Sequence, residues 1–145
     1  MKHSLLQQQF DSAIWVAHTL FNRCRVTGST GNLSFLHDNQ IYITASGCCF
    51  GQITEQDFSM IDKSGTVLGS KKPSKEWPLH LALYKNSRSP VSAVLHTHST
   101  FLTLWSCMSD LSDINPIPQY TPYLSMKTNS VIAIPYHPPG STALF

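Results

Sequence analysis

One short segment constrains the fold of this chain more than any other: residues 91–98, which begin with a largely apolar stretch, 91–95, and end in His96-Thr97-His98. Such a run predicts a strand, and residues i and i+2 of a strand project from the same face. The imidazoles of His96 and His98 are therefore expected to point into one space. Two neutral imidazoles can chelate one Zn²⁺ ion there, but two core histidines bonded to backbone groups fit the same pattern.

A carboxylate earlier in the chain favours the metal site. Glu76 precedes His96 by 20 residues and stands at the entrance of a predicted helix, where its side chain can turn toward a neighbouring strand. It is a candidate metal ligand, a candidate general base, or both in turn. His80 follows on the same helix face at a spacing that also suits ligation. It could instead support the ligands without binding the metal, or be a packing residue with its hydrogen bonds satisfied, and we favour the structural interpretation. The expected ligands are therefore Glu76, His96 and His98, around Zn²⁺ or another divalent metal.

Three short loops of small residues form a second pattern: 29–32, 44–47 and 73–75. Glycine lets backbone N–H groups approach an anion closely, and Ser, Thr and Asn add short hydrogen-bonding groups. The third loop also opens a predicted helix, whose positive dipole end favours phosphate. Any one of these loops fits an ordinary turn. Together, and with Lys75 beside the candidate metal carboxylate, they predict a small phosphorylated substrate.

Apolar periodicity predicts an alternation of helices and short strands. Three- and four-residue spacing marks the helices, and shorter apolar runs bounded by turn residues mark the strands. The expected helices span 5–25, 73–87 and 99–108, and the expected strands span 33–35, 41–44, 58–62, 66–69, 91–98 and 131–134. Ser141-Thr142 has the composition of a further helix cap, close to the last residue, Phe145. We therefore expect 1–145 to be a single domain that lacks its C-terminal part.

The composition argues against several classes of partner. Lys and Arg number 10 against 8 Asp and Glu, so no strong field points to nucleic acid or to an anionic membrane. No apolar stretch approaches the roughly 18 residues that a membrane span needs, and no secretory signal is apparent. The four cysteines form no C-x-x-C pattern, so we interpret them as reduced cytoplasmic thiols, mostly buried. With only 12% of its residues charged, the chain is expected to cover surface in a homo-oligomer.

Four motifs, in order along the chain, resemble those of the class II aldolase/adducin family. They are Gly31-Asn32-Leu33-Ser34, Ile43-Thr44-Ala45-Ser46-Gly47, Pro73-Ser74-Lys75-Glu76 and His96-Thr97-His98. The resemblance covers nearly the whole chain. It implies an α/β fold, a three-layer α/β/α sandwich with a mainly antiparallel central sheet, and assembly as a tetramer.

The resemblance also implies roles for individual residues. The residues that would hold the substrate phosphate are Ser29, Gly31, Asn32, Ser46, Gly47 and Ser74. His96 and His98 would be zinc ligands, and Glu76 would be a ligand or a proton acceptor. Tyr120 falls where several family members place a tyrosine near the substrate. The family normally supplies a further zinc-binding histidine farther along the chain than Phe145.

Lys75 distinguishes branches of the family. The segment 73–84 resembles the 3-oxo-tetronate 4-phosphate decarboxylases, whereas the fuculose- and rhamnulose-phosphate aldolases tend to have serine at the position of Lys75. A lysine there can orient the carboxylate of a sugar acid. We therefore expect a zinc-dependent lyase that releases CO₂ from a 3-oxo-tetronate 4-phosphate through an enediolate and forms dihydroxyacetone phosphate. The alternatives are an aldolase of the fuculose- or rhamnulose-phosphate type and an inactive adducin-like domain.

Overall fold

The computed structural model of the chain describes residues 4–108, 114–128, 130–138, 141 and 143. They fall into two compact units, which are described separately. Of these described residues, the first unit holds those up to His98 together with Ser141 and Ala143, and the second holds those from Ser99 to Pro138. Within this described part of the chain, no helix combines the length and the apolarity that crossing a membrane requires.

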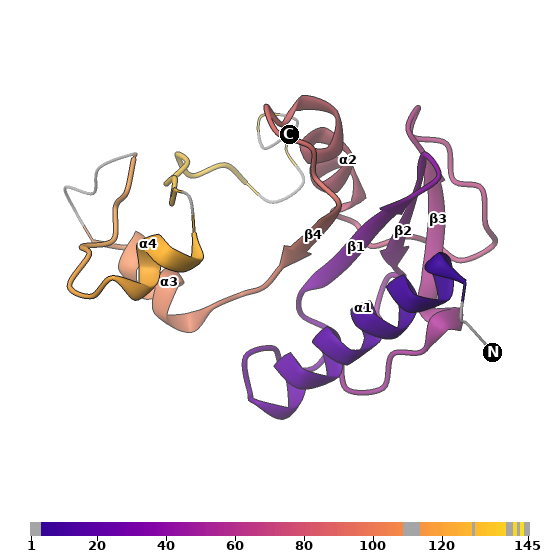
Figure 1. Ribbon diagram of the computed structural model, residues 1–145, viewed down its shortest axis with the longest axis horizontal. Coiled ribbons are helices and arrows are strands. Elements are labelled where there is room, and N and C mark those ends of the chain that lie inside the picture. The colour runs from indigo at the N-terminus through magenta and orange to yellow at the C-terminus, as the bar shows by residue number, and fades with distance from the viewer. Residues whose placement is uncertain (1–3, 109–113, 129, 139–140, 142, 144–145) are drawn as a thin grey trace. The chain divides into compact units, whose positions relative to one another are not determined.

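The first unit is built on a four-stranded sheet with the strand order β3-β2-β1-β4 (Figure 1). Each pair of neighbouring strands is antiparallel. The strands are β1 (Asn32–His37), β2 (Gln40–Thr44), β3 (Phe58–Asp62) and β4 (Ala93–His96). The turn between β1 and β2 consists of Asp38 and Asn39, which both have the positive φ that suits a two-residue hairpin. Because Asn32 pairs with His96, the first residue of β1 lies beside the last residue of β4.

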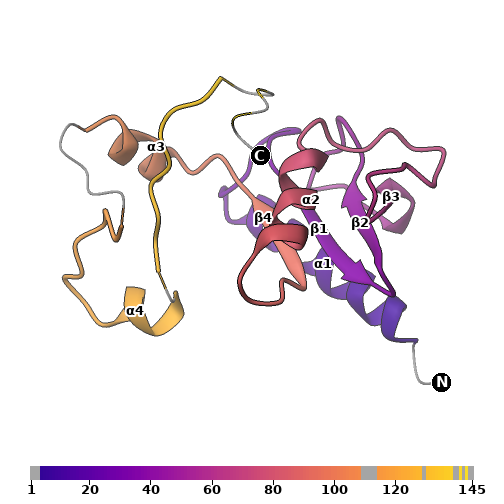
Figure 2. The same cartoon turned by 90° about the horizontal axis from the view of Figure 1, so that it is seen from above.

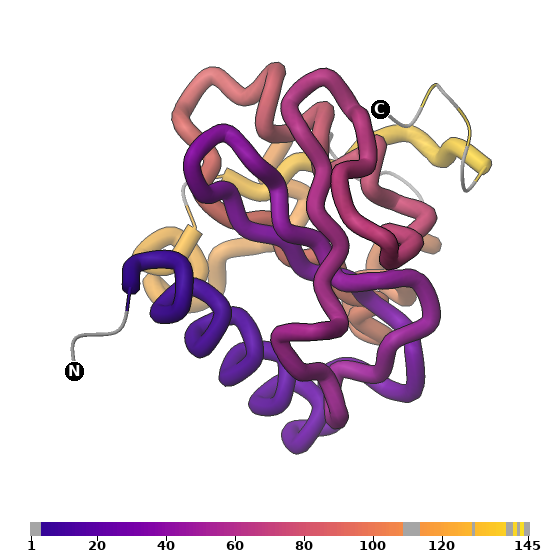
Figure 3. The backbone as a smooth tube through the Cα atoms, turned by 90° about the vertical axis from the view of Figure 1, so that its right-hand side faces the viewer, coloured from indigo at the N-terminus to yellow at the C-terminus, as the bar shows by residue number. Residues whose placement is uncertain are grey.

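Helix α1 (Leu5–Asn22) covers one face of this sheet. Its first turn is capped by the hydroxyl of Ser4, which accepts a hydrogen bond from a backbone N–H three residues later (3.2 Å). Phe10 points inward and packs against Phe35 and Phe58, with ring centroids 5.1 and 5.3 Å apart. Figure 3 shows the helix, in indigo, below the purple hairpin of β1 and β2. Burial of this apolar stripe holds the helix on the sheet.

Helix α2 (Trp77–Asn86) covers the opposite face. Leu81 packs there in a second cluster of buried side chains, together with Ile41, Ile43 and Ile61 of the sheet. Seen from above, α2 lies in front of the sheet and α1 lies behind it (Figure 2). Two helical layers thus enclose an antiparallel sheet, which confirms the expected α/β/α sandwich.

The start of the second expected helix was predicted wrongly. The helix begins at Trp77 and not at Pro73, because the residues before it continue as extended chain beside β2. Ala45 forms a bridge with Pro73, and the Ser74 N–H donates to the carbonyl oxygen of Thr44 (3.0 Å). These backbone hydrogen bonds satisfy groups that a helical turn would otherwise have used.

Several other expectations differ from the structure. The strands expected at 66–69 and 131–134 are each reduced to an isolated bridge. In the second unit, the third expected helix is confirmed as α3 (Thr100–Ser106), and a helix that the sequence did not predict, α4 (Tyr123–Lys127), follows it. The cap expected at Ser141-Thr142 extends outside the described residues.

The four cysteines are free, but the expectation that most of them are buried was wrong. Cys24 and Cys107 are exposed, and Cys48 and Cys49 are half-buried. Cys24 lies in the turn that ends α1, with a positive φ, and Cys107 caps the end of α3. Residues at such chain reversals face solvent, whatever their apolar character.

Candidate metal centre

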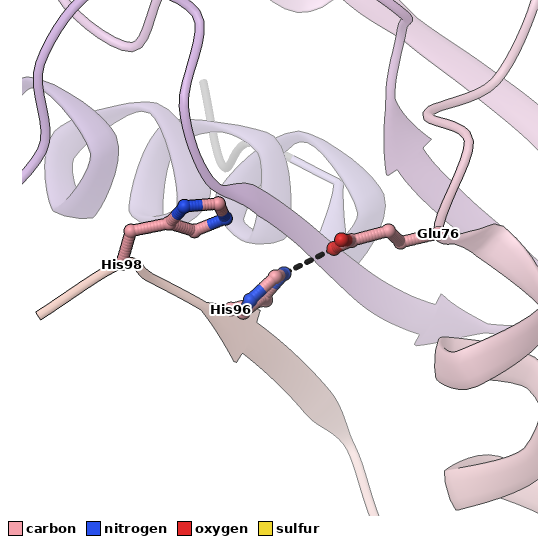
Figure 4. A group of neighbouring side chains, drawn as sticks. All are labelled: Glu76, His96 and His98. Atoms are coloured by element: carbon pink, nitrogen blue, oxygen red, sulfur yellow. Dashed lines mark hydrogen bonds and ion pairs between the residues drawn. The ribbon is translucent and has the colours of Figure 1, made fainter. Parts of the chain in front are cut away.

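Three side chains meet where β1 begins and β4 ends (Figure 4). Glu76 is the residue immediately before α2, His96 is the last residue of β4, and His98 follows two residues later. One donor atom from each residue, a carboxylate oxygen or an imidazole nitrogen, lies within 4.8 Å of the other two. The two imidazole rings are neighbours, with centroids 4.9 Å apart. The structure thus brings together the three residues that the sequence proposed as ligands.

This donor set fits a divalent metal ion. Zinc binds imidazole nitrogen and carboxylate oxygen at about 2.0–2.2 Å, so two ligand atoms on one ion are at most about 4.4 Å apart. The donor atoms of the three residues lie within 4.8 Å of one another. Small side-chain rotations that move these atoms by about 1 Å bring them to the spacing of ligands on one ion. A catalytic zinc site commonly uses three protein ligands and leaves one position for water or substrate. Two histidines and a glutamate are a donor set of that kind.

The carboxylate of Glu76 has close neighbours on β1 as well as on β4. Its Oε2 atom contacts Nδ1 of His96 and accepts a hydrogen bond from the side-chain amide of Asn32 (2.7 Å). The same amide nitrogen lies 3.3 Å from Nδ1 of His96. The side chains of Glu76 and His96 are 32% and 29% exposed. Partial burial strengthens these polar contacts relative to the same contacts in water.

His80 contacts the side chain of Asn32 and is completely buried. Its Nε2 atom lies 2.5 Å from the carbonyl oxygen of the Asn32 side chain, and its Nδ1 atom lies 2.7 Å from the hydroxyl of Ser34. The hydroxyl of Ser34 in turn lies 2.8 Å from the hydroxyl of Tyr84. Both ring nitrogens of His80 therefore have partners from the protein. This agrees with the interpretation of His80 as a structural residue.

Burial changes the acid–base properties of these side chains. It lowers the pKa of His80 from 6.5 to about 4, an effect to which the neighbouring His96 adds and which Glu76 opposes. Burial also raises the pKa of Tyr84 to about 12. At neutral pH, His80 is therefore a neutral imidazole and Tyr84 is a neutral phenol.

The lowered pKa of His80 predicts a loss of stability in acid. Between pH 6.5 and pH 4, the unfolded chain binds a proton at this imidazole and the folded chain does not, so stability falls as pH falls through that range. The loss reaches at most about 3 kcal/mol. Urea unfolding of the wild type and of His80→Gln, at pH 7 and at pH 4.5, measures it. The wild type should lose about 2 kcal/mol more than the variant on acidification, and equal losses would contradict the prediction.

The loops that were predicted to bind phosphate lie at the same end of the sheet. Gly31 precedes β1, Ser46 and Gly47 follow β2, and Ser74 lies in the segment before α2. The Ser46 N–H donates to the carbonyl oxygen of Lys72 (2.9 Å), which holds the second loop against the third. The role of these residues in phosphate binding stays a prediction.

The other predicted site residues differ in their placement. Asn32 is only 5% exposed and directs its amide at Glu76. Ser29 and Lys75 are exposed. Tyr120 belongs to the second unit, where it is 90% exposed. The catalytic roles of Lys75 and Tyr120 also stay predictions.

Residues 12–144 match a family model, that of the Class II Aldolase and Adducin N-terminal domain. The match covers nearly the entire chain. The chain belongs to this family. The four motifs that suggested the resemblance all lie inside the matched range, so the family assignment made from the sequence is confirmed.

Relatives of this class II aldolase domain include two kinds of enzyme. The chain is 37% identical over 134 residues to the 3-oxo-tetronate 4-phosphate decarboxylase of Haemophilus influenzae. This match covers 92% of the chain and 63% of the relative. The chain is also 33% identical over 131 residues to the L-fuculose phosphate aldolase of Methanococcus maripaludis. That match covers 90% of the chain and 69% of the relative.

The solved structures give a similar picture. Escherichia coli YgbL, described as a candidate aldolase/epimerase/decarboxylase, matches with a TM-score of 0.90 and 35% identity. The match covers 97% of the chain and 68% of YgbL. The chain therefore spans only part of its relatives, namely 63% of the Haemophilus decarboxylase and 59% of an E. coli one.

Two polar residues that lie beside the candidate metal centre were missed in the sequence, Ser34 and Tyr84. Their positions carry a signal, because Glu76, His80 and Tyr84 follow one another at four-residue steps and therefore share one side of the helical segment. Asn32 and Ser34 are alternate residues of β1 and share one face of the sheet. Polar residues that repeat on two facing elements indicate a buried hydrogen-bond network.

Gly31 offers a test of the packing between β1 and β4. It has a φ of +82°, and a Cβ atom added to it would lie 2.9 Å from the carbonyl oxygen of His96. Gly31→Ala is expected to lower the unfolding free energy by about 2–3 kcal/mol, through backbone strain and this contact, and to weaken zinc binding because His96 must move. Gly28→Ala is the matched control, since Gly28 has a φ of +55° and nothing within 4 Å. If urea unfolding and zinc titration give the same losses for both variants, the contact with His96 is irrelevant.

Proposed function

We propose that this class II aldolase domain is part of a Zn²⁺-dependent lyase that decarboxylates a 3-oxo-tetronate 4-phosphate to dihydroxyacetone phosphate and CO₂. The proposal rests on the group formed by Glu76, His96 and His98, at the end of the sheet where the small-residue loops also lie. Similarity to the Haemophilus decarboxylase, at 37% identity over 92% of the chain, supports the choice of substrate.

The reaction needs a stable place for the electrons that CO₂ leaves behind. The bond between C1 and C2 breaks, and C1 departs as CO₂. The electron pair becomes the C2–C3 double bond of an enediolate, whose charge lies on the oxygen at C3. A proton added at C2 then gives dihydroxyacetone phosphate. A Zn²⁺ ion held by Glu76, His96 and His98 would supply positive charge that stabilises such an enediolate.

Residues of the chain carry out the remaining tasks. Glu76, which Asn32 holds by a hydrogen bond, binds the metal or transfers the proton. Lys75 is exposed beside it and provides a cation for the substrate carboxylate. The loops supply backbone N–H groups and hydroxyls for the substrate phosphate. The members of the phosphate site are Ser29, Gly31, Asn32, Ser46, Gly47 and Ser74.

The test is an assay of the zinc-loaded protein on both substrate classes. Dihydroxyacetone phosphate forms in either reaction, so CO₂ release must be measured alongside it. Release of one CO₂ per dihydroxyacetone phosphate from a 3-oxo-tetronate 4-phosphate is expected. Cleavage of a sugar 1-phosphate without any CO₂ release from the tetronate would overturn the decarboxylase proposal.

An aldolase is the second candidate function, favoured by the 33% identity to the Methanococcus L-fuculose phosphate aldolase. Both reactions pass through the same enediolate, so the same metal and phosphate sites serve either one. The group that leaves the substrate is the difference. A protein that neither binds zinc nor converts either substrate would instead be a non-catalytic, adducin-like domain.

We also expect the protein to assemble as a homotetramer in the cytoplasm. A low content of charged residues, 12%, favours an assembly that covers part of the surface. Light scattering during size-exclusion chromatography measures the assembly directly.

A further inference from the structure

We infer that His80 is a positioning residue, which acts through Asn32 to hold the carboxylate of Glu76. A chain of hydrogen bonds from Tyr84 through Ser34 and His80 keeps the NH₂ end of the Asn32 side chain directed at Glu76. This inference rests on the proposed function, in which Glu76 is a metal ligand or a proton acceptor. It adds to that function the residues that determine where the carboxylate points.

The orientation of the Asn32 amide follows from its two partners. The carbonyl end of an amide accepts hydrogen bonds, and its NH₂ end donates them. The Glu76 carboxylate only accepts, so the NH₂ end must face it, at 2.7 Å. The carbonyl end then faces Nε2 of His80. Because Asn32 is only 5% exposed, water has little access to either end.

This orientation in turn determines where His80 carries its hydrogen. Nε2 must be protonated, because it donates to the carbonyl oxygen of Asn32. A neutral imidazole has only one N–H, so Nδ1 accepts the hydrogen of the Ser34 hydroxyl (2.7 Å). Ser34 then accepts the hydrogen of the Tyr84 hydroxyl (2.8 Å). While His80 is neutral, reversing the direction of any one of these hydrogen bonds would leave two acceptor atoms facing each other without a hydrogen between them.

The network also fixes how α2 sits on the sheet. Asn32 and Ser34 belong to β1, whereas His80 and Tyr84 lie one turn apart on α2. Glu76 precedes His80 by one further turn, so the helix that carries the network follows the carboxylate directly. Packing alone would not require these polar groups, since burying them is unfavourable unless each has a partner. The network therefore serves to orient polar atoms at the candidate metal centre.

A first experiment determines the tautomer of His80 in the metal-free wild type. Nuclear magnetic resonance of ¹⁵N-histidine-labelled protein at neutral pH identifies which ring nitrogen carries the hydrogen. Protonation at Nε2 alone is the expected result. Protonation at Nδ1, or at both nitrogens, would overturn the inference. This measurement needs neither a metal nor a variant that folds.

A second experiment measures zinc affinity by competition with a chelator. His80→Phe keeps a ring but removes the donor, and it should bind zinc about 10- to 100-fold more weakly than the wild type. His80→Gln places an amide NH₂ near the position of Nε2, so its affinity should stay within about threefold of the wild type. Tyr84→Phe is a graded comparison: it loses the hydroxyl at the far end of the network but keeps the donor to Asn32, so its zinc affinity should fall less than that of His80→Phe.

Equal losses in His80→Phe and His80→Gln, with both proteins folded by circular dichroism, would show a packing role and overturn the inference. Zinc affinity that is unchanged in His80→Phe would also overturn it. If the wild type itself binds no zinc, the proposed function fails. In that case the tautomer of His80 still decides whether Asn32 is oriented as inferred.

Discussion

Replacement of His96 by alanine is expected to remove zinc-dependent turnover. His96 supplies one of three candidate ligands and also contacts Glu76, so the variant loses a donor atom and frees the carboxylate. Zinc affinity should fall by more than about 100-fold. Replacing a residue that only supports a metal ligand lowers affinity by up to about 100-fold, and loss of a ligand itself should cost more. Turnover at a fixed zinc concentration should fall by about 10³-fold or more, because the metal accounts for several kcal/mol of transition-state stabilisation.

The matched control is His37→Ala. His37 is the last residue of β1, at the opposite end of that strand from Asn32, and its Nδ1 atom bonds to Gln9. This variant should keep zinc affinity and turnover close to those of the wild type. Isothermal titration with zinc and the coupled assay for dihydroxyacetone phosphate provide both readouts. A His96→Ala protein that retains wild-type affinity would rule out the metal centre formed with Glu76 and His98.

The layers of the fold could be predicted because they depend on local patterns. The apolar stripe of α1 and the strands β1, β2 and β3 carry their own periodicity, and they are buried as the pattern requires. The residues of β4 are exposed or half-buried. The failed boundaries depend on distant residues. Pro73-Ser74 has the composition of a helix entrance, but a bridge to Ala45 and a hydrogen bond to Thr44 draw the segment along β2. No pattern within 73–76 reports on that pairing.

The candidate metal ligands and the residues that hold them in place also differ in how far the sequence predicts them. His96 and His98 could be paired from sequence, because residues two apart on a strand share a face. Glu76 could be added on the ground that a helix entrance can turn toward a strand. Spacing marks Ser34 and Tyr84 as candidates for a buried network, but it does not pair them. Their hydrogen bond depends on how α2 packs on β1, and Tyr84 also fits the apolar face of a helix. The sequence thus predicts the candidate metal ligands better than the residues that hold them in place.

Replacement of Phe10 by alanine is expected to give the largest loss of stability in the first unit. Phe10 is 5% exposed and packs against Phe35, Tyr42 and Phe58, so its removal leaves a cavity between α1 and the sheet. Phe-to-Ala substitutions in cores cost about 3–5 kcal/mol. Domains of this kind are stable by about 5–15 kcal/mol, so the variant should lose a large share of its stability. Urea unfolding followed by circular dichroism measures the difference.

Trp15→Ala is the matched control, since Trp15 lies on the same helix and is 67% exposed. Its loss should stay within about 0.5 kcal/mol, as for most surface substitutions. The loss of unfolding free energy in Phe10→Ala should therefore exceed the loss in Trp15→Ala by at least about 2 kcal/mol. Similar losses in the two variants would contradict the placement of α1 with its Phe10 face on the sheet. Similar losses that appear only at concentrations where the protein is oligomeric would show instead that another subunit covers Trp15, because an interface adds its own stability by mass action.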